Sequence, residues 1–299
     1  MPKVSVIMPV YNVELFLRQA IESILRQTFT DFEFIVLNDG STDRCDEIIR
    51  SYNDSRIRYH TQPNRGLIKT LNSLLSFATG DYIARMDSDD SSLPDRLEQQ
   101  STFLDLNPEC GFVGSWISAI DVTGKYMYLD RYPCSSSFIR NTLLVYNSFA
   151  HGSVMMRRSL QPKYDLQQKF VEDYDLWCRL ILLSQGHNIP QTLYQWRANP
   201  NGESQKNLAS QEEAAKIVRR EYYHNLQKSG ERPISYLDLR NEIQARGVLR
   251  TYNSILIFSG ARWRLGEGYR AIIFGVRNSI LFSFTILTHF FKVCLKGFK

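Results

Sequence analysis

Short apolar runs alternate with longer segments of helical spacing along the first ninety residues. The runs predict strands at residues 4–10, 32–37, 57–60 and 81–86, and the segments between them predict helices at 15–27, 43–52 and 67–78. Strands that alternate with helices in this way form βαβ units, which build a parallel sheet with right-handed crossovers. The pattern therefore predicts an α/β fold with a mostly parallel central sheet.

After residue 95 the pattern is less regular. It favours a hairpin of strands at 111–120 and 126–129, a buried strand at 153–156, and helices at 95–106, 135–146 and 172 to about 185. Leu176, Leu180 and Leu183 should form the apolar face of the last helix. From about residue 210 the pattern is mostly helical. We therefore expect a main body at residues 1–205 and a helical C-terminal region at residues 206–299.

Polar turns follow three of the first four predicted strands. They contain Tyr11 and Asn12 after the first strand, residues 38–41 after the second, and three aspartates after the fourth. Ligands of open α/β sheets bind at the carboxyl ends of strands, so these turns should converge on one crevice. The first turn has no GxGxxG glycines and the chain has no GxxxxGK[ST] motif, which argues against a dinucleotide-binding enzyme and a P-loop NTPase.

The three aspartates are Asp87, Asp89 and Asp90. Carboxylates this close repel one another unless a positive charge is bound, and Mg²⁺ and Mn²⁺ prefer oxygen ligands of this kind. The alternative is a solvated acidic turn ahead of a helix that begins near Pro94, because proline is common in the first helical turn. The cluster alone favours neither interpretation.

Composition indicates an ordinary globular protein. The chain has 299 residues, of which 43% are hydrophobic, and a net charge of +5. Its five cysteines are scattered without a CxxC pair, so zinc and a disulfide framework are disfavoured and a reducing, cytoplasmic compartment is expected. The N-terminal residues predict no secretory signal.

Positive charge is concentrated near the C-terminus. Residues 247–299 carry eight basic side chains and a single acidic one, Glu267, which indicates an anionic surface, either membrane or nucleic acid, as partner. Within this tail, residues 278–291 form an uncharged run that is shorter than the ~18 apolar residues of a membrane span. The tail is expected either to lie on a membrane surface as an amphipathic helix or to cover the main body as a helical hairpin.

Five motifs follow one another between residues 3 and 200. They are VSVIMPVYN at 4–12, NDGSTD at 38–43, GDYIARMDSDD at 80–90, HGSVMMR at 151–157 and EDYDLW at 172–177. Each motif alone is weak, but in this order and spacing they resemble those of family 2 glycosyltransferases with the GT-A fold. The resemblance implies a nucleotide-diphosphate-sugar donor, a UDP-sugar being favoured, and an inverting transfer of the sugar.

The resemblance also implies how the main body is divided. Residues 1–95 would bind the donor, and residues 96–205 would bind a saccharide or lipid-linked acceptor in surface polysaccharide synthesis. Arg65 and Lys69 flank a helix start and could reach phosphate, although a solvated loop is an equal alternative. The expected donor-binding residues are Pro9, Tyr11, Asn12, Asn38, Asp39, Arg65, Lys69, Asp87 and Ser88.

A Mn²⁺ or Mg²⁺ cofactor follows from the same resemblance. Asp89 matches the direct metal ligand, Asp87 matches a residue shared between the metal and the ribose, and Asp90 would support or cap the loop. A bound cation stabilises the negative charge that grows on a diphosphate leaving group. The Glu172–Asp173 pair matches the catalytic acid pair of the family, with Asp173 as the general base. The alternative is that both acids cap a helix.

Three residues are expected on the acceptor side: His151, Trp177 and Arg179. A lone histidine such as His151 is more often structural, and Arg179 should pair with a nearby acid or remain solvated. No nucleic-acid partner is expected.

Two departures from the family pattern bear on function. Asn38 precedes Asp39 where many relatives have two aspartates, so nucleotide preference could differ. Residues 195–197 read QWR instead of the QxxRW motif of processive members, and no spanning segment is present, which favours one sugar per encounter. Rival interpretations are a sugar nucleotidyltransferase, whose glycine-rich loop is missing, and a binding protein on a transferase scaffold.

Overall fold

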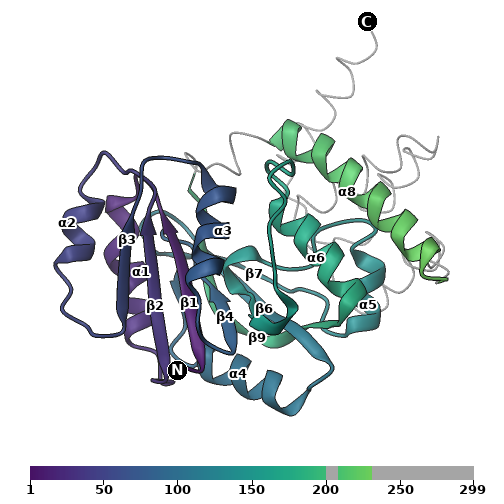
Figure 1. Cartoon of the computed structure of the whole chain (residues 1–299), viewed down its shortest axis with the longest axis horizontal. Helices are drawn as coiled ribbons and strands as arrows, with labels where there is room; N and C mark the ends of the chain where they lie inside the picture. The colour runs from purple at the N-terminus through teal and green to yellow at the C-terminus, as the bar shows by residue number, and fades with distance from the viewer. Residues whose placement is uncertain (200–207, 231–299) are drawn as a thin grey trace, which may run out of the picture. The chain divides into compact units, whose positions relative to one another are not determined.

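A mixed sheet of nine strands forms the centre of the computed structural model, which describes residues 1–199 and 208–230 (Figure 1). The sheet has the strand order β3-β2-β1-β4-β8-β6-β9-β5, and β7 pairs with β6. The strands are β1 (Val4–Val10), β2 (Phe32–Asn38), β3 (Ile57–Thr61), β4 (Tyr82–Arg85), β5 (Ser91–Ser92), β6 (Cys110–Ile120), β7 (Tyr126–Asp130), β8 (Met155–Arg157) and β9 (Gln185–Arg197).

The N-terminal half of the sheet is parallel. β1 pairs in parallel with β2 and β4, and β2 pairs in parallel with β3. Beyond β4, the short strand β8 is antiparallel to both β4 and β6, whereas β6 and β9 are parallel. The α/β fold expected from the sequence is confirmed, and β8 joins the parallel N-terminal half of the sheet to the half that contains β6 and β9.

Helices cover both faces of the sheet. Val4, Val6 and Met8 pack in one core cluster with α1, α2 and α4, whereas Ile7 packs in a second cluster with α3, α5, α6 and α8. Alternate residues of β1 thus enter opposite layers, as the period of a strand requires. The helices are α1 (Glu14–Leu25), α2 (Cys45–Arg50), α3 (Leu67–Phe77), α4 (Arg96–Leu106), α5 (Ser136–Thr142), α6 (Glu172–Leu183) and α8 (Leu208–Lys228).

The structure corrects the sequence expectations in the C-terminal half of the main body. The sequence prediction has no counterpart to β9, whose first residue, Gln185, was expected to end a helix. Pro190 breaks the pattern of this strand, and it is tolerated because it lies at a register shift between Ile189 and Thr192 where β6 supplies no partner. Leu183, expected on the apolar face of α6, is 71% exposed.

Two smaller differences concern element boundaries. The strand expected at residues 153–156 is shortened to β8 by a 3-10 helix at His151–Ser153, and the helix expected at 135–146 ends at Thr142.

The helix α8 packs on the main body through α6. Its apolar residues Val218, Tyr222 and Leu226 are each at most 2% exposed, and the Tyr222 hydroxyl donates to the Arg140 carbonyl at 3.0 Å. The C-terminal tail with its predicted amphipathic helix lies outside the described residues. Within residues 1–199 and 208–230, no helix has the length and apolar character needed to cross a membrane.

A buried acid ties together the strand ends opposite the candidate crevice. Glu33 Oε1 accepts hydrogen bonds from Ser5 Oγ at 2.6 Å, Thr79 N at 2.8 Å and Thr79 Oγ1 at 2.7 Å, and Arg58 pairs with its other oxygen. Burial alone would raise the pKa of Glu33, but the hydrogen bonds from Ser5, Arg58 and Thr79 lower it to about 2. The ionised carboxylate therefore stabilises the fold.

We expect Glu33→Gln to lower the free energy of unfolding at pH 7 by about 2 kcal/mol, because it leaves buried donors without a charged acceptor. The folded pKa lies below the unfolded value, so the advantage of the wild type should be complete above pH 4.5 and vanish as the pH falls toward 2. Urea denaturation measures this difference. Glu22→Gln is the matched control, because the ion pair of Glu22 with Arg26 is exposed to solvent; equal losses in both variants would contradict the assignment.

Candidate functional site

The carboxyl ends of β1, β2 and β4 bring the three polar turns to one edge of the sheet. Asn12 Oδ1 accepts a hydrogen bond from Thr42 N at 2.8 Å, and Asn12 N donates to Ser41 Oγ at 3.1 Å, so the first two turns are bound to each other. Asn12 has a φ of 49°, a left-handed conformation that asparagine tolerates better than most residues. The convergence expected from the topology is present.

Asn38 and Asp39 are buried, and the fold uses part of their hydrogen-bonding capacity. Asn38 Oδ1 accepts from Ser41 N at 2.9 Å. Asp39 Oδ1 accepts from Gln62 Nε2 at 2.7 Å and Arg65 N at 2.9 Å, and Oδ2 accepts from Gly66 N at 2.9 Å. Asp39 thus shapes the loop that leads into α3. A carboxylate has about four acceptor positions, so capacity for a ligand remains.

The other expected donor residues differ in exposure. Pro9 is buried within β1, whereas Tyr11 is 51% exposed beside the turns. Arg65 and Lys69 are exposed at the start of α3, where a phosphate can reach them. Their assignment to the donor stays a prediction.

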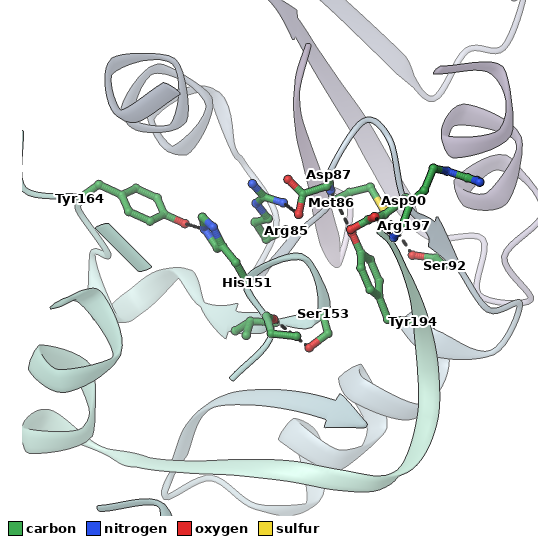
Figure 2. A network of polar contacts seen from close by, with 12 residues as sticks. Arg85, Met86, Asp87, Asp90, Ser92, His151, Ser153, Tyr164, Tyr194 and Arg197 are labelled. Atoms are coloured by element: carbon green, nitrogen blue, oxygen red, sulfur yellow. Dashed lines mark hydrogen bonds and ion pairs between the residues drawn. The ribbon is translucent and has the colours of Figure 1, made fainter. Parts of the chain in front are cut away.

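The aspartate loop, residues 87–90, is held by side chains of β9 (Figure 2). Asp87 N donates to the Tyr194 hydroxyl at 3.1 Å. Arg197 N donates to Asp90 Oδ1 at 2.7 Å, and Arg197 Nε donates to the Asp89 carbonyl at 2.8 Å. Asp90 is only 2% exposed, which agrees with its expected role in supporting the loop.

Arg197 and Tyr194 were not among the residues expected at the site. The guanidinium of Arg197 also donates to the Asp121 carbonyl at 3.0 Å and to Gln19 Oε1 at 2.5 Å, so it joins the aspartate loop to α1 and to the β6–β7 turn. No local motif marks such a residue, because its partners come from three distant segments. The nearest signal was the departure from the QxxRW motif at residues 195–197.

Gly152 allows the loop and β9 to approach each other. A Cβ atom at this position would lie 2.1 Å from the Tyr194 hydroxyl and 2.8 Å from Asp87 Oδ2. The glycine of the HGSVMMR motif is therefore required by close approach.

The acidic pair Glu172 and Asp173 begins α6. Asp173 Oδ2 accepts a hydrogen bond from Asn147 Nδ2 at 2.7 Å, and Oδ1 accepts from Tyr174 N at 2.7 Å. Burial and then the charge of Asp173 raise the pKa of Glu172 to about 7. Burial also raises the pKa of Asp173, although its two hydrogen bonds oppose the shift. The bond from Tyr174 N satisfies a backbone donor in the first turn of α6, as a helix cap does. The bond from Asn147 comes from outside the helix and has no such role.

Arg85 is the buried positive charge between these two acidic groups. Its side chain is 2% exposed at the end of β4, and Nη1 forms an ion pair with Asp87 Oδ2. Burial and the charge of Asp87 raise the pKa of Asp89 to about 6, and Arg85 partly offsets both effects. Arg85 also opposes the rise in pKa of Glu172 and Asp173, so its field reaches the start of α6.

His151 lies on the side of Arg85 opposite to Asp87 (Figure 2). Its Nε2 is 2.8 Å from the hydroxyl of the buried Tyr164. Burial and then the charge of Arg85 hold the pKa of His151 well below 6.5, so the ring is neutral at physiological pH.

The structure corrects the acceptor-side expectation for Trp177. This residue is 0% exposed, with ring centroids 5.7 Å from Phe112 and 5.8 Å from Phe149, so it packs in the core and does not reach an acceptor. Arg179 pairs with Asp175 at 2.7 Å, as expected for a nearby acid.

Arg179 also faces away from the aspartate loop. It lines a separate cavity of about 200 Å³ between α6 and α8, to which no residue of the aspartate loop contributes. Its expected contact with an acceptor has no support in this placement.

The residues fit a divalent cation of the expected kind. Burial and then repulsion from Asp87 raise the pKa of Asp89, and a cation would relieve that repulsion. In the part of the chain that the structure describes, no group of three or more histidine, cysteine, aspartate and glutamate side chains is arranged to hold a metal. Mg²⁺ usually takes one or two carboxylates and completes its shell with substrate phosphates, which suits this pair.

Comparison with known proteins gives a consistent result. A family model described as glycosyl transferase family 2 matches residues 5–162. The putative glycosyltransferase EpsE of Bacillus subtilis is 38% identical over 208 residues, covering 66% of this chain and 73% of that protein. The O-antigen biosynthesis glycosyltransferase WbnJ of Escherichia coli is 32% identical over 232 residues, covering 73% of this chain and 88% of that protein.

Solved structures share the fold at low sequence identity. Residues 1–349 of S. aureus TarS with UDP-GlcNAc give a TM-score of 0.59 at 21% identity; the match covers 72% of this chain and 65% of that chain, less than two thirds of it. The mannosyltransferase PcManGT of Pyrobaculum calidifontis with GDP-Man and Mn²⁺ gives a TM-score of 0.59 at 17% identity. This match covers 98% of this chain and 81% of that chain.

The family model spans more than half of the sequence, and the chain covers most of a relative that is 38% identical. This chain therefore belongs to glycosyl transferase family 2 and is a glycosyltransferase with the GT-A fold.

Proposed function

We propose that the enzyme transfers one sugar, with inversion, from a nucleotide-diphosphate-sugar to a hydroxyl of a saccharide or lipid-linked acceptor. The observation that carries the proposal is that the aspartate loop and the Glu172–Asp173 pair lie around the same buried arginine, Arg85. A group that would bind the diphosphate and a group that would accept the proton could thereby act in one site.

The donor would occupy the edge formed by the turns after β1, β2 and β4, within residues 1–95. Tyr11 offers an exposed ring for the base, and Asp39 and Asn12 lie beside it. A UDP-sugar is favoured, and the UDP-GlcNAc complex of TarS supports it, while the GDP-Man complex of PcManGT keeps the guanine alternative open.

Asp89 and Asp87 would hold a Mn²⁺ or Mg²⁺ ion, as the Mn²⁺ complex of PcManGT supports. Such an ion neutralises the charge that develops on the leaving diphosphate. Ser88 and the loop backbone, fixed by Arg197 and Tyr194, would orient the donor at this point.

Asp173 would act as the general base. The acceptor hydroxyl oxygen attacks the anomeric carbon, the bond from that carbon to the diphosphate oxygen breaks with its electron pair leaving on the diphosphate, and the hydroxyl proton passes to Asp173. Asn147 Nδ2 donates a hydrogen bond to the carboxylate of Asp173 at 2.7 Å, and burial raises the pKa of Asp173 and with it the basicity of the carboxylate.

The acceptor would bind within residues 96–205, and the similarity to an O-antigen glycosyltransferase supports a role in surface polysaccharide synthesis. The basic residues of the tail support docking of the enzyme on the cytoplasmic face of an anionic membrane, where a lipid-linked acceptor is found. Flotation of the full chain with anionic and neutral liposomes tests this; equal partitioning into both would remove the membrane role.

Donor preference can be read from thermal stabilisation. In the presence of Mn²⁺ we expect UDP-sugars to raise the melting temperature more than GDP- or dTDP-sugars, because a ligand at 100 times its Kd adds about 2.7 kcal/mol to stability. Asp89→Ala should lose most of the shift. A larger shift with a GDP-sugar would overturn the preference for UDP.

Measurements of turnover distinguish the proposed roles of Asp173 and Asp89. Asp173→Asn keeps the shape of the side chain but cannot accept the proton, so kcat should fall about 10³-fold while donor binding is retained. Asp89→Ala should abolish stimulation by Mn²⁺. Asp54→Asn, which removes the partner of Arg56 ahead of β3, is the control and should behave as the wild type. Wild-type kcat in Asp173→Asn would rule out this base.

The pH profile of kcat should report the acidic pair. The base is active only when ionised, and burial raises the pKa of Asp173, so as the pH is lowered kcat should begin to fall at a higher pH than it would with a solvent-exposed aspartate as base. Glu172→Gln removes the neighbouring negative charge and should move this limb to lower pH. Saturating steady-state assays between pH 5 and 9 measure it. A limb near pH 4 in the wild type would contradict the assignment.

A further inference from the structure

Arg85 differs from the other buried arginines of the site in how it is held. Arg96 donates to the Arg85 carbonyl at 2.7 Å and to Ser92 Oγ at 2.8 Å, and Arg197 donates to several acceptors around the aspartate loop. Arg85 Nε, by contrast, has no hydrogen-bond partner among residues 1–199 and 208–230. Its side chain is 2% exposed and contacts Asp87 through an ion pair. Arg85 is thus held mainly by charge.

Burying a guanidinium is costly unless negative charge lies beside it. Asp87, on the loop that follows β4, supplies that charge through the ion pair and a side-chain hydrogen bond. Figure 2 shows the guanidinium between Asp87 and His151, where water has little access. In such surroundings a unit charge acts over a longer range than in bulk water.

We propose that Arg85 is a positioning residue for the transfer reaction, which holds Asp87 through their ion pair until a divalent cation binds. This inference rests on the proposed function. Arg85 acts through Asp87 and does not touch the reacting atoms.

The ion pair has a consequence for metal binding. Arg85 and the cation compete for Asp87, and two positive charges in one poorly hydrated site repel each other. Replacing Arg85 by an uncharged side chain should therefore tighten the binding of Mn²⁺ alone. The same change leaves Asp87 without the partner that orients it, so transfer should slow.

The experiment compares wild type, Arg85→Met and Arg85→Lys as full-length chains. Mn²⁺ alone is titrated into each protein, and free Mn²⁺ is counted by electron paramagnetic resonance. We expect Arg85→Met to bind Mn²⁺ about tenfold more tightly and to lose about tenfold or more in kcat. Arg85→Lys keeps the charge and should return both values toward the wild type, without matching it fully because lysine is a shorter point charge.

Arg56→Met is the matched control, because Arg56 forms a half-buried ion pair with Asp54 away from the aspartate loop. It should leave both Mn²⁺ affinity and kcat unchanged. Should Arg85→Met fail to fold, Arg85→Gln provides a second uncharged variant, and circular dichroism establishes which is folded. Folded uncharged variants that bind Mn²⁺ with wild-type or weaker affinity would overturn the proposal. So would loss of kcat in Arg85→Lys equal to that in Arg85→Met.

The two proposals fail in different ways. A wild-type enzyme that binds Mn²⁺ but transfers no sugar from any donor would contradict the proposed function. The role of Arg85 is decided separately by the Mn²⁺ titration, which requires no turnover.

Discussion

The balance between one buried cation and four carboxylates governs the candidate site. Arg85 enters it from the end of β4 and is nearly inaccessible to solvent. Without its charge, the aspartate loop and the acidic pair of α6 would repel one another across a space with little water. Burial raises the pKa values of Asp89 and Glu172, and the charges of Asp87 and Asp173, respectively, add to the rise.

The scaffold around this balance is built from distant parts of the chain. The parallel half of the sheet aligns the ends of β1, β2 and β4, and β8 links it to the half that carries α6. Strand β9 then returns beneath the aspartate loop and places Tyr194 and Arg197 against it. The loop is thus fixed by a strand that lies about a hundred residues later, which explains why rigidity at the site depends on the whole main body.

Local sequence patterns sufficed for the elements that have local causes. The βαβ alternation predicted the parallel sheet, and the aspartate cluster and the Glu172–Asp173 pair were found because each is a short motif. The convergence of the turns after β1, β2 and β4 also followed from topology, since parallel strands end at the same edge.

The remaining features depend on packing between distant segments. The sequence did not predict β9 because Pro190 interrupts its pattern. The register shift that accommodates this proline arises from the pairing with β6 and has no local signal in the sequence. Trp177 was assigned to the acceptor side, although α6 turns it into the core between Phe112 and Phe149. Arg85 stood in a recognised motif without an assigned role, since its burial and its charged neighbours on α6 become visible only in three dimensions.

The central claim is that the aspartate loop and Asp173 face one reacting centre from opposite sides. A crystal structure with Mn²⁺ and an unreactive nucleotide-sugar analogue tests it most directly, with the metal located by anomalous scattering. The account predicts an anomalous peak in contact with Asp89 and the diphosphate, and an anomeric carbon that lies between the diphosphate and the Asp173 carboxylate. A metal bound elsewhere, or an anomeric carbon whose free face points away from Asp173, would contradict it.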